Sequence, residues 1–188
     1  LVLVLYLAYL THAQILWLSG IMLTTLSSID LLRWRFAGLN EFIFEQFGNF
    51  TQPHERLRMT SATWFWVAMF LVALLDHPIT YIASLAILTL ADQAGSIFGR
   101  RFGTIPLGSG RSLQGSLAFL IVGAGSAALA LICSSEAISM SDAVLVSLGG
   151  GFTGALAELG SERIDDNLSV GIVTGSTVFA LSTLLGLG

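Results

Sequence analysis

Lysine is absent from this chain of 188 residues, and charge of either sign is scarce. All 8 basic residues are arginine, and charged residues make up 11% of the chain, against about 25% in soluble domains. Apolar residues make up 54%, and the mean hydropathy is +0.82. This scarcity of charge excludes an ordinary soluble domain, a disordered chain and a nucleic-acid-binding protein. The composition instead favours a protein embedded in a lipid bilayer.

Cysteine occurs once, as Cys133, which excludes an internal disulfide and any zinc site built from cysteines. Its apolar surroundings predict a small side chain in the core. The chain begins at Leu1 inside an apolar stretch and lacks the charged start of a signal peptide, so we expect further residues upstream.

Long apolar runs predict an all-α fold: one polytopic membrane bundle of about seven transmembrane helices over residues 1–188. A spanning helix needs about 20 mostly apolar residues. The runs cover residues 1–10 (the end of a span that starts upstream), 13–32, 61–75, 79–98, 113–133, 143–159 and 168–187. The run 61–75 is short for a span, so we expect its helix to extend further on the N-terminal side.

Every arginine falls in one of three connections that alternating spans place on the same side of the membrane. These are residues 33–60, residues 99–112 and the segment around Arg163, whereas the connections on the other side contain no arginine. Arginine and lysine concentrate in the cytoplasmic loops of membrane proteins. We therefore expect an integral, multi-pass protein whose arginine-rich side faces the cytoplasm.

The connection 33–60 contains large apolar residues at helical spacing. They are Phe36, Leu39, Ile43, Phe47 and Phe50. Polar residues fall largely elsewhere, so the spacing predicts one amphipathic helix lying in the membrane interface. Two interpretations stay open: a helix packed on the cytoplasmic end of the bundle, and a gate for a lipid substrate.

Asp92 lies within the apolar run 79–98, where a carboxylate is costly and should meet a partner in the bundle interior. Gly95, Gly99 and Gly103 follow at four-residue spacing, on about the same helical face. Glycines at this spacing are typical of closely packed helices. The neighbouring carboxylate favours a ligand, such as a metal-bound phosphate.

The connection 99–112 is rich in glycine and contains or adjoins Arg100, Arg101 and Arg111. Backbone amides of a glycine-rich turn can hold phosphate oxygens, and arginine adds bidentate contacts. The spacing and the lysine of a P-loop are absent. The residues alone fit both a phosphate-binding loop and a plain connection whose arginines set the topology.

Carboxylates gather where the run 143–159 ends. Asp165, Asp166 and Asn167 offer hard oxygen ligands suited to Mg²⁺, but the same residue types also cap helix N-termini. One of them can cap a helix while the others bind metal. Glu158 falls inside the apolar run, where a charge calls for a function. Carboxylates, arginines and glycine-rich turns are together what phosphoryl transfer requires.

Two neighbouring segments, ADQAGSIFGRRFG (91–103) and RSLQGSLAF (111–119), resemble motifs of the CTP-using lipid kinases. This family includes phytol kinase, dolichol kinase and the CTP-dependent diacylglycerol kinase. The segment ALAELGSERIDDNLSV (155–170) resembles a later element of the family, and HERLRMTSATWFW (54–66) is similar to a weaker one. The resemblance implies a membrane-embedded CTP-transferase-like domain that moves the γ-phosphate of CTP to a lipid alcohol (polyprenol, phytol or diacylglycerol) with a divalent cation.

Residue chemistry and the resemblance together give the candidate roles. Catalytic roles fall on Asp92, Arg111 and Glu158. Metal binding, of Mg²⁺ or another divalent cation, falls on Asp92, Asp165, Asp166 and Asn167. Nucleotide binding falls on Gly95, Gly99, Arg100, Arg101, Gly103, Arg111, Ser112 and Gly115. The expected partners are the bilayer, the lipid alcohol and CTP, with no nucleic acid.

The chain departs from the family pattern at three positions: Ala91 replaces a glycine, Arg111 a lysine and Gln114 an acid. The related phosphatidate cytidylyltransferases, which make CDP-lipid from CTP, share the aspartate–glycine block. Their later element carries a histidine and a second arginine, which IDDNLSVGIVTG (164–175) lacks. The kinase is therefore the expected function and the cytidylyltransferase its alternative. A non-catalytic transporter or lipid-binding protein, with Asp92 and Glu158 as intramembrane ion sites, is a third hypothesis.

Overall fold

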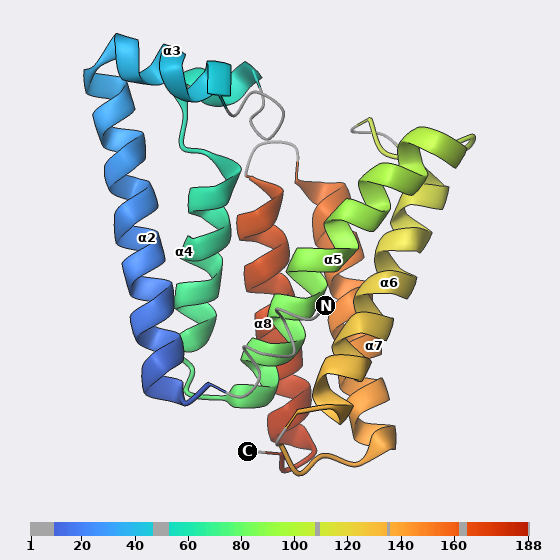
Figure 1. The fold of residues 1–188 in the computed structure, drawn as a ribbon. Helices are drawn as coiled ribbons and strands as arrows, with labels where there is room; N and C mark the ends of the chain where they lie inside the picture. The colour runs from blue at the N-terminus through green and yellow to red at the C-terminus, as the bar shows by residue number, and fades with distance from the viewer. Residues whose placement is uncertain (1–9, 47–52, 108–109, 135, 162–164, 188) are drawn as a thin grey trace.

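A computed structural model describes residues 10–46, 53–107, 110–134, 136–161 and 165–187 of the chain. These residues form an all-helical bundle, and none of them belongs to a strand (Figure 1). The helices are α2 (His12–Arg35), α3 (Ala37–Gln46), the short 3₁₀ helix η1 (Pro53–Leu57), α4 (Ser61–Ala73), α5 (Pro78–Phe102), α6 (Leu113–Ile132), α7 (Met140–Gly160) and α8 (Asp166–Leu184). The predicted fold class is confirmed.

Five of these helices, α2, α5, α6, α7 and α8, are long and apolar enough to cross a membrane. Each coincides with an apolar run expected to span, so the protein is a multi-pass helical membrane protein. The expected first run, 1–10, lies outside the described residues except for Leu10.

The helix α4 corrects one expectation. Its 13 residues begin at Ser61, with no extension on the N-terminal side. The preceding residue, Thr60, is held outside the helix because its backbone N–H donates to Asp30 Oδ2 at 3.0 Å, and its hydroxyl lies 3.3 Å from the same oxygen. A helix of this length rises about 20 Å, less than the roughly 30 Å of the hydrocarbon core.

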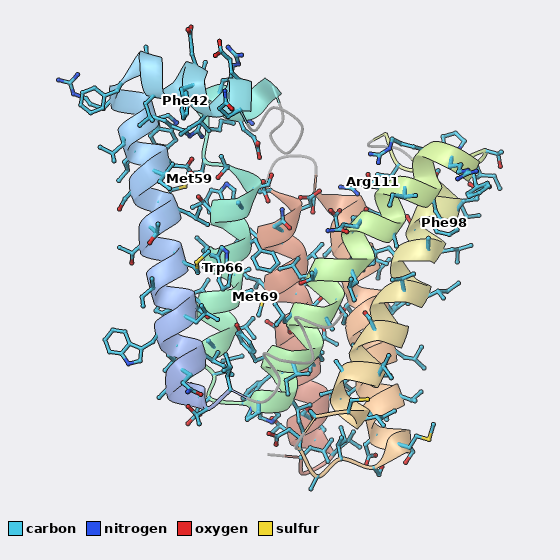
Figure 2. All side chains as sticks on the ribbon, in the orientation of Figure 1. Phe42, Met59, Trp66, Met69, Phe98 and Arg111 are labelled. Carbon is cyan, nitrogen blue, oxygen red and sulfur yellow. The ribbon has the colours of Figure 1, made fainter. Side chains whose placement is uncertain are left out.

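The predicted interfacial helix is present as α3, which lies across the ends of α2 and α4 (Figure 1), but Phe36 stands outside it as the C-cap of α2. Its buried residue is Phe44, whose ring faces the guanidinium groups of Arg33 and Arg56 at 5.6 and 5.2 Å. Phe42 is exposed (Figure 2). One side of the helix therefore packs on the bundle, and the predicted continuation to Phe50 lies outside the described residues.

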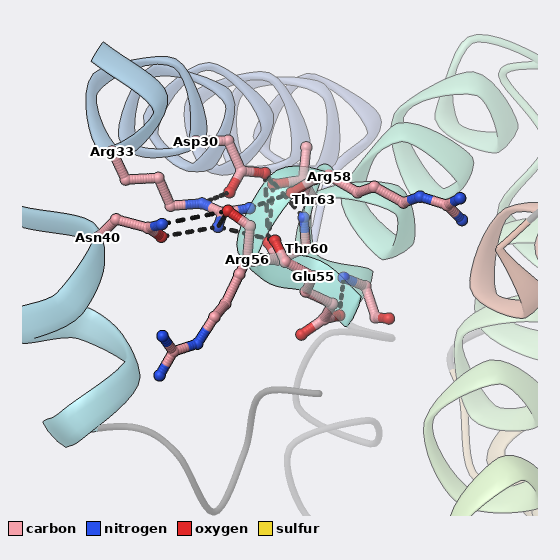
Figure 3. A network of polar contacts seen from close by, with 9 residues as sticks. Asp30, Arg33, Asn40, Glu55, Arg56, Arg58, Thr60 and Thr63 are labelled. Carbon is pink, nitrogen blue, oxygen red and sulfur yellow. Dashed lines mark hydrogen bonds and ion pairs between the residues drawn. The ribbon is translucent and has the colours of Figure 1, made fainter. Parts of the chain in front are cut away.

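A buried ion pair within α2 anchors a network of hydrogen bonds that reaches the start of α4, and we call this network the α2–α4 clasp (Figure 3). Arg33 Nε donates to Asp30 Oδ1 at 2.7 Å, and both residues are 1% exposed. Arg33 also donates to the backbone carbonyls of Glu55 and Arg58. The second carboxylate oxygen of Asp30 accepts the Thr63 hydroxyl at 2.7 Å. An arginine expected only to set topology thus ties together two helices and the segment between them.

The core centres on α5, which packs against α4, α6, α7 and α8 and is buried along most of its first eleven residues. Cys133 corrects a second expectation, because it is exposed rather than in the core. It forms the C-cap of α6, where the chain leaves the helix.

All described arginines lie toward one end of the bundle, which we call the arginine end. It is formed by the C-terminal ends of α2, α5 and α7 and the N-terminal ends of α4, α6 and α8 (Figure 1). Arg33 and Arg35 are in the last turn of α2, and Arg100 and Arg101 are in the last turn of α5. Arg111 precedes α6, and Arg163 lies outside the described residues.

Candidate functional site

A cavity of about 560 Å³ toward the arginine end gathers most of the candidate site residues. Its lining comes from α4, α5, the loop before α6, α6, α7 and α8. The lining residues are Ser61, Asp92, Gly95, Ser96, Gly99, Arg100, Gly110, Arg111, Ser112, Gly115, Ser116, Glu158, Asp166 and Asn167. Ten of these were singled out from the sequence, so residues up to 75 positions apart meet in one space.

Arg111 is one of the two arginines that line the cavity, and it lies toward the arginine end of the bundle (Figure 2). Its Nη1 donates to Glu158 Oε1 on α7, and its Nη2 donates to Asp166 Oδ2 on α8 at 3.0 Å. Glu158 is 3% exposed, whereas the Arg111 side chain is 24% exposed. The guanidinium group therefore joins two helices and still faces the cavity, and three of its five N–H groups remain for a ligand.

The loop before α6 has a defined backbone at both ends. Leu107 N–H donates to the carbonyl of Arg111 at 2.9 Å, and Pro106 pairs with Ser112 as an isolated antiparallel bridge. Gly110 has φ +71°, a conformation that favours glycine. The turn thus brings Arg111 back to the start of α6. Residues 108 and 109, within the predicted loop 99–112, lie outside the described residues.

Gln114 does not line the cavity, and its side chain bonds to this loop. Its Oε1 accepts the backbone N–H of Thr104 at 3.1 Å, and its Nε2 contacts the Thr104 hydroxyl at 2.5 Å. An amide serves both contacts, because it supplies an acceptor and a donor at once.

The glycines of α5 form a close contact with α6, as the packing interpretation expected. A Cβ added to Gly115 would lie 2.9 Å from the carbonyl oxygen of Gly95 and 3.1 Å from Cα of Gly99. Gly95 and Gly99 also line the cavity, so both interpretations of them stay open. Gly103 packs against Ser112 and is absent from the lining.

Arg101 is also absent from the lining, and its guanidinium group lies 5.5 Å from the centre of the Phe102 ring. Arg100 does line the cavity and donates to Ser96 Oγ at 2.6 Å. Of the two adjacent arginines, only Arg100 therefore faces the site.

The start of α8 separates three of the four predicted metal ligands. Asp165 is the N-cap, its Oδ1 accepts the Asn167 backbone N–H at 3.0 Å, and its Oδ2 accepts the Ser61 hydroxyl at 2.9 Å. Burial raises the pKa of Asp165, and the hydrogen bond from Ser61 offsets part of that increase. Asp165 thus caps the helix and does not line the cavity, whereas Asp166 and Asn167 do.

Two residues that line the cavity carry a buried oxygen without a hydrogen-bond partner among the described residues. These oxygens are Glu158 Oε2 and Ser116 Oγ. Asp92 is close enough to Glu158 and Asp166 for their charges to repel one another. Three carboxylates and two arginines line the cavity, a surplus of negative charge that a bound cation would offset.

This donor set fits Mg²⁺, although the described residues contain no group of three or more Asp, Glu, His or Cys residues that could hold a metal ion. Magnesium usually binds through one or two carboxylates and completes its shell with water and substrate phosphates. Asp92 and Asp166 line the cavity and could each supply a carboxylate oxygen, and Asn167 could add an amide oxygen.

Four lining residues were missed from the sequence: Ser61, Ser96, Gly110 and Ser116. Ser96 lies four positions after Asp92 and shares its helical face, a signal that could have identified it. Ser116 follows Gly115 directly. Ser61 lies in the segment 54–66, which was quoted for a weak resemblance, but its place at the cavity depends on the packing of α4 against α8.

Comparisons of the chain with protein-family models, with curated proteins and with solved structures gave no significant match. The fold and the cavity therefore define the class by themselves: a multi-pass helical membrane protein with a polar, charged cavity toward one end of its bundle.

Proposed function

We propose that this protein is a membrane-embedded phosphotransferase that moves the γ-phosphate of CTP to the hydroxyl group of a lipid alcohol. The observation that carries this proposal is the convergence of Asp92, Arg100, Arg111, Glu158 and Asp166 on one cavity of a bilayer protein. Phosphoryl transfer depends mainly on positioning and on charge neutralisation, which these side chains supply. The resemblance of residues 91–119 and 155–170 to the CTP-using lipid kinases supports CTP as the donor.

In the proposed reaction, the lipid oxygen bonds to the γ-phosphorus as the bond from that phosphorus to the β–γ bridging oxygen breaks. CDP leaves, and the proton of the lipid hydroxyl passes to a carboxylate. Arg111 and Arg100 are the candidate phosphate ligands. Asp92 is the candidate proton acceptor or cation ligand, with Asp166 and Asn167 as further oxygen ligands. When bound, a divalent cation would neutralise charge on the phosphates.

We further propose that the arginine end faces the cytoplasm, where CTP is available. The described arginines all lie toward that end, as positive-inside topology requires. This orientation would open the cavity toward the compartment that holds the nucleotide.

The test is transfer of label by the purified protein in lipid micelles with Mg²⁺, using CTP labelled at either the γ- or the α-phosphate. The lipid panel contains phytol, a long polyprenol, dioctanoylglycerol and phosphatidate. Transfer of the γ label to an alcohol is the expected result. Transfer of the α label to phosphatidate would replace the kinase with a cytidylyltransferase.

Absence of both transfers would favour a transporter or a lipid-binding protein, in which Asp92 and Glu158 are ion sites. The Asp92→Asn variant is the matched control, because it keeps the size of the side chain and removes its charge. If the observed transfer survives in Asp92→Asn, the activity does not belong to this cavity.

A further inference from the structure

One wall of the cavity differs in origin from the others. Ser61 is the only described lining residue that comes from the α2–α4 part of the chain, whereas the other walls belong to α5–α8 and the loop before α6. It is the first residue of α4, and its hydroxyl bonds to Asp165 at the start of α8. The α4 side of the cavity therefore presents a serine hydroxyl group and differs in chemistry from the walls that carry the arginines.

The hydrogen bonds of Ser61 fix its orientation. Its backbone N–H donates to Glu55 Oε1 at 2.7 Å, and its hydroxyl donates to Asp165 Oδ2 at 2.9 Å. The residue before it, Thr60, is held by Asp30 of the α2–α4 clasp. Both donors of Ser61 are thus engaged, and the hydroxyl oxygen retains lone pairs that can only accept a hydrogen bond.

A fixed acceptor discriminates between the two substrates of the proposed reaction. An ionised phosphate carries no donor, so it gains nothing from this oxygen and is repelled by Asp165 beside it. An alcohol carries one O–H and suits it. The cationic wall, with Arg100, Arg111 and the turn at Gly110, has the opposite preference.

We propose that Ser61 binds the accepting hydroxyl of the lipid at the α4 side of the cavity, while Arg100 and Arg111 hold the nucleotide phosphates. This inference rests on the proposed function and names the substrate contact within it. Because the transition state of phosphoryl transfer is loose, the hydroxyl keeps its proton until late in the reaction. A neutral acceptor can therefore hold the hydroxyl throughout binding.

The test compares Ser61→Ala and Ser61→Thr with the wild type in lipid-alcohol kinase assays. Ser61→Ala should raise KM for the lipid about three- to tenfold, the effect of one lost hydrogen bond, and leave KM for CTP unchanged. Ser61→Thr keeps the hydroxyl and should restore the lipid KM. The matched control is Ser161→Ala, which removes a bonded serine at the end of α7 outside the cavity and should change neither KM. Equal increases of both KM values in Ser61→Ala would show a merely structural role and overturn the proposal.

A binding experiment without nucleotide separates this inference from the proposed function. Tryptophan fluorescence, which includes Trp64 near Ser61, can follow titration with phytol and dioctanoylglycerol, each beside its methyl ether. The ether lacks the donor, so it should bind the wild type more weakly than the alcohol and should be insensitive to Ser61→Ala. If Ser61→Ala weakens alcohol binding but no phosphate is transferred, the kinase proposal fails and the Ser61 contact stands. If the wild type binds alcohol and ether equally, or binds neither, the Ser61 proposal fails.

Discussion

Arg111 shows how the function of a residue depends on surroundings that the sequence does not display. Its guanidinium group reaches Glu158 and Asp166 with two different nitrogens. A single ammonium is a point charge and cannot match that geometry. The two partners lie 47 and 55 positions away along the chain, so local sequence could not reveal them.

Loss of Arg111 should therefore destabilise the protein as well as inactivate it. Arg111→Ala leaves the carboxylate of Glu158 buried and unpaired, at a cost of about 1–3 kcal/mol in the free energy of unfolding. Adding Glu158→Gln should recover part of that loss, because the buried charge is removed. Thermal unfolding in detergent measures the stability of each single variant and of the double variant. If the effects of the two single variants simply add in the double variant, the pairing is contradicted. Arg111→Lys should fold but transfer phosphate at least tenfold more slowly.

Asp165 gives a prediction about pH. Burial raises its pKa in the folded protein above the ordinary value for an aspartate, so the folded state binds the proton more tightly than the unfolded state does. Its contribution to stability is therefore present at low pH and is lost as the pH rises through the raised pKa. Asp165→Asn can still cap α8, since asparagine caps as well as aspartate.

The Asp165→Asn variant should thus gain stability relative to the wild type as the pH rises from about 4 toward 7. Unfolding curves of both proteins in detergent across that range check the sign. A stability difference that is constant with pH would show that Asp165 does not titrate as its burial requires.

At the scale of elements, the contact between α5 and α6 depends on the absence of side chains at a few positions. Gly115 faces the backbone of α5 at Gly95 and Gly99. The glycine spacing in α5 predicted close packing, but the sequence could not show which helix would fill the contact. The structure identifies it as α6, whose N-terminal half carries Ser112 and Gly115 into the cavity.

Gly115→Ala should force α5 and α6 apart, because its Cβ would lie 2.9 Å from a backbone oxygen that cannot turn away. We expect a loss of about 1–3 kcal/mol in the free energy of unfolding, as for overpacking elsewhere. Gly125→Ala in the same helix is the matched control, since its Cβ would meet no atom within 4 Å. It should stabilise α6 by up to about 1 kcal/mol. Equal effects of the two variants on the melting temperature would argue against the contact.

The α2–α4 clasp is a second feature of the fold that the sequence did not predict. Arg33 is 1% exposed and paired with Asp30, so Arg33→Ala should cost about 3–5 kcal/mol in the free energy of unfolding. Its neighbour Arg35 is exposed, and Arg35→Ala should change that free energy by less than about 0.5 kcal/mol. Melting of the two variants in detergent provides the comparison. A small loss of stability in Arg33→Ala would show that the clasp contributes little to the stability of the fold.

At the scale of the whole molecule, hydropathy predicted the helices better than it predicted their ends. The apolar runs found each of the five spanning helices because burial in lipid leaves a long, unambiguous signal. The expected N-terminal extension of α4 was wrong, because the start of this helix depends on Asp30, which lies 30 residues before Thr60 in the chain. Cys133 was placed in the core because an apolar run does not show where a helix turns its side chain outward.

The candidate site followed the same rule. Charges within apolar runs were informative, because each charge in a membrane helix needs a partner or a function, and Asp92 and Glu158 do lie on one cavity. The sequence did not show which of several neighbouring residues would face the cavity. Gly103, Arg101 and Asp165 face helix contacts or the surface, while adjacent residues face the cavity. Adjacent positions on a helix point in different directions, and only the packing of the helices determines which of them faces the cavity.

The orientation of the whole molecule in the membrane is testable through its single cysteine. Cys133 is exposed at the C-terminal end of α6, opposite to the arginine end. If the arginines face the cytoplasm, a membrane-impermeant maleimide should label Cys133 in intact cells. In a Cys133→Ser background, Arg101→Cys places the thiol at the arginine end, where labelling should require permeabilised cells. The reverse pattern would invert the topology and leave the cavity facing away from cytoplasmic CTP, which would contradict the proposed kinase as well.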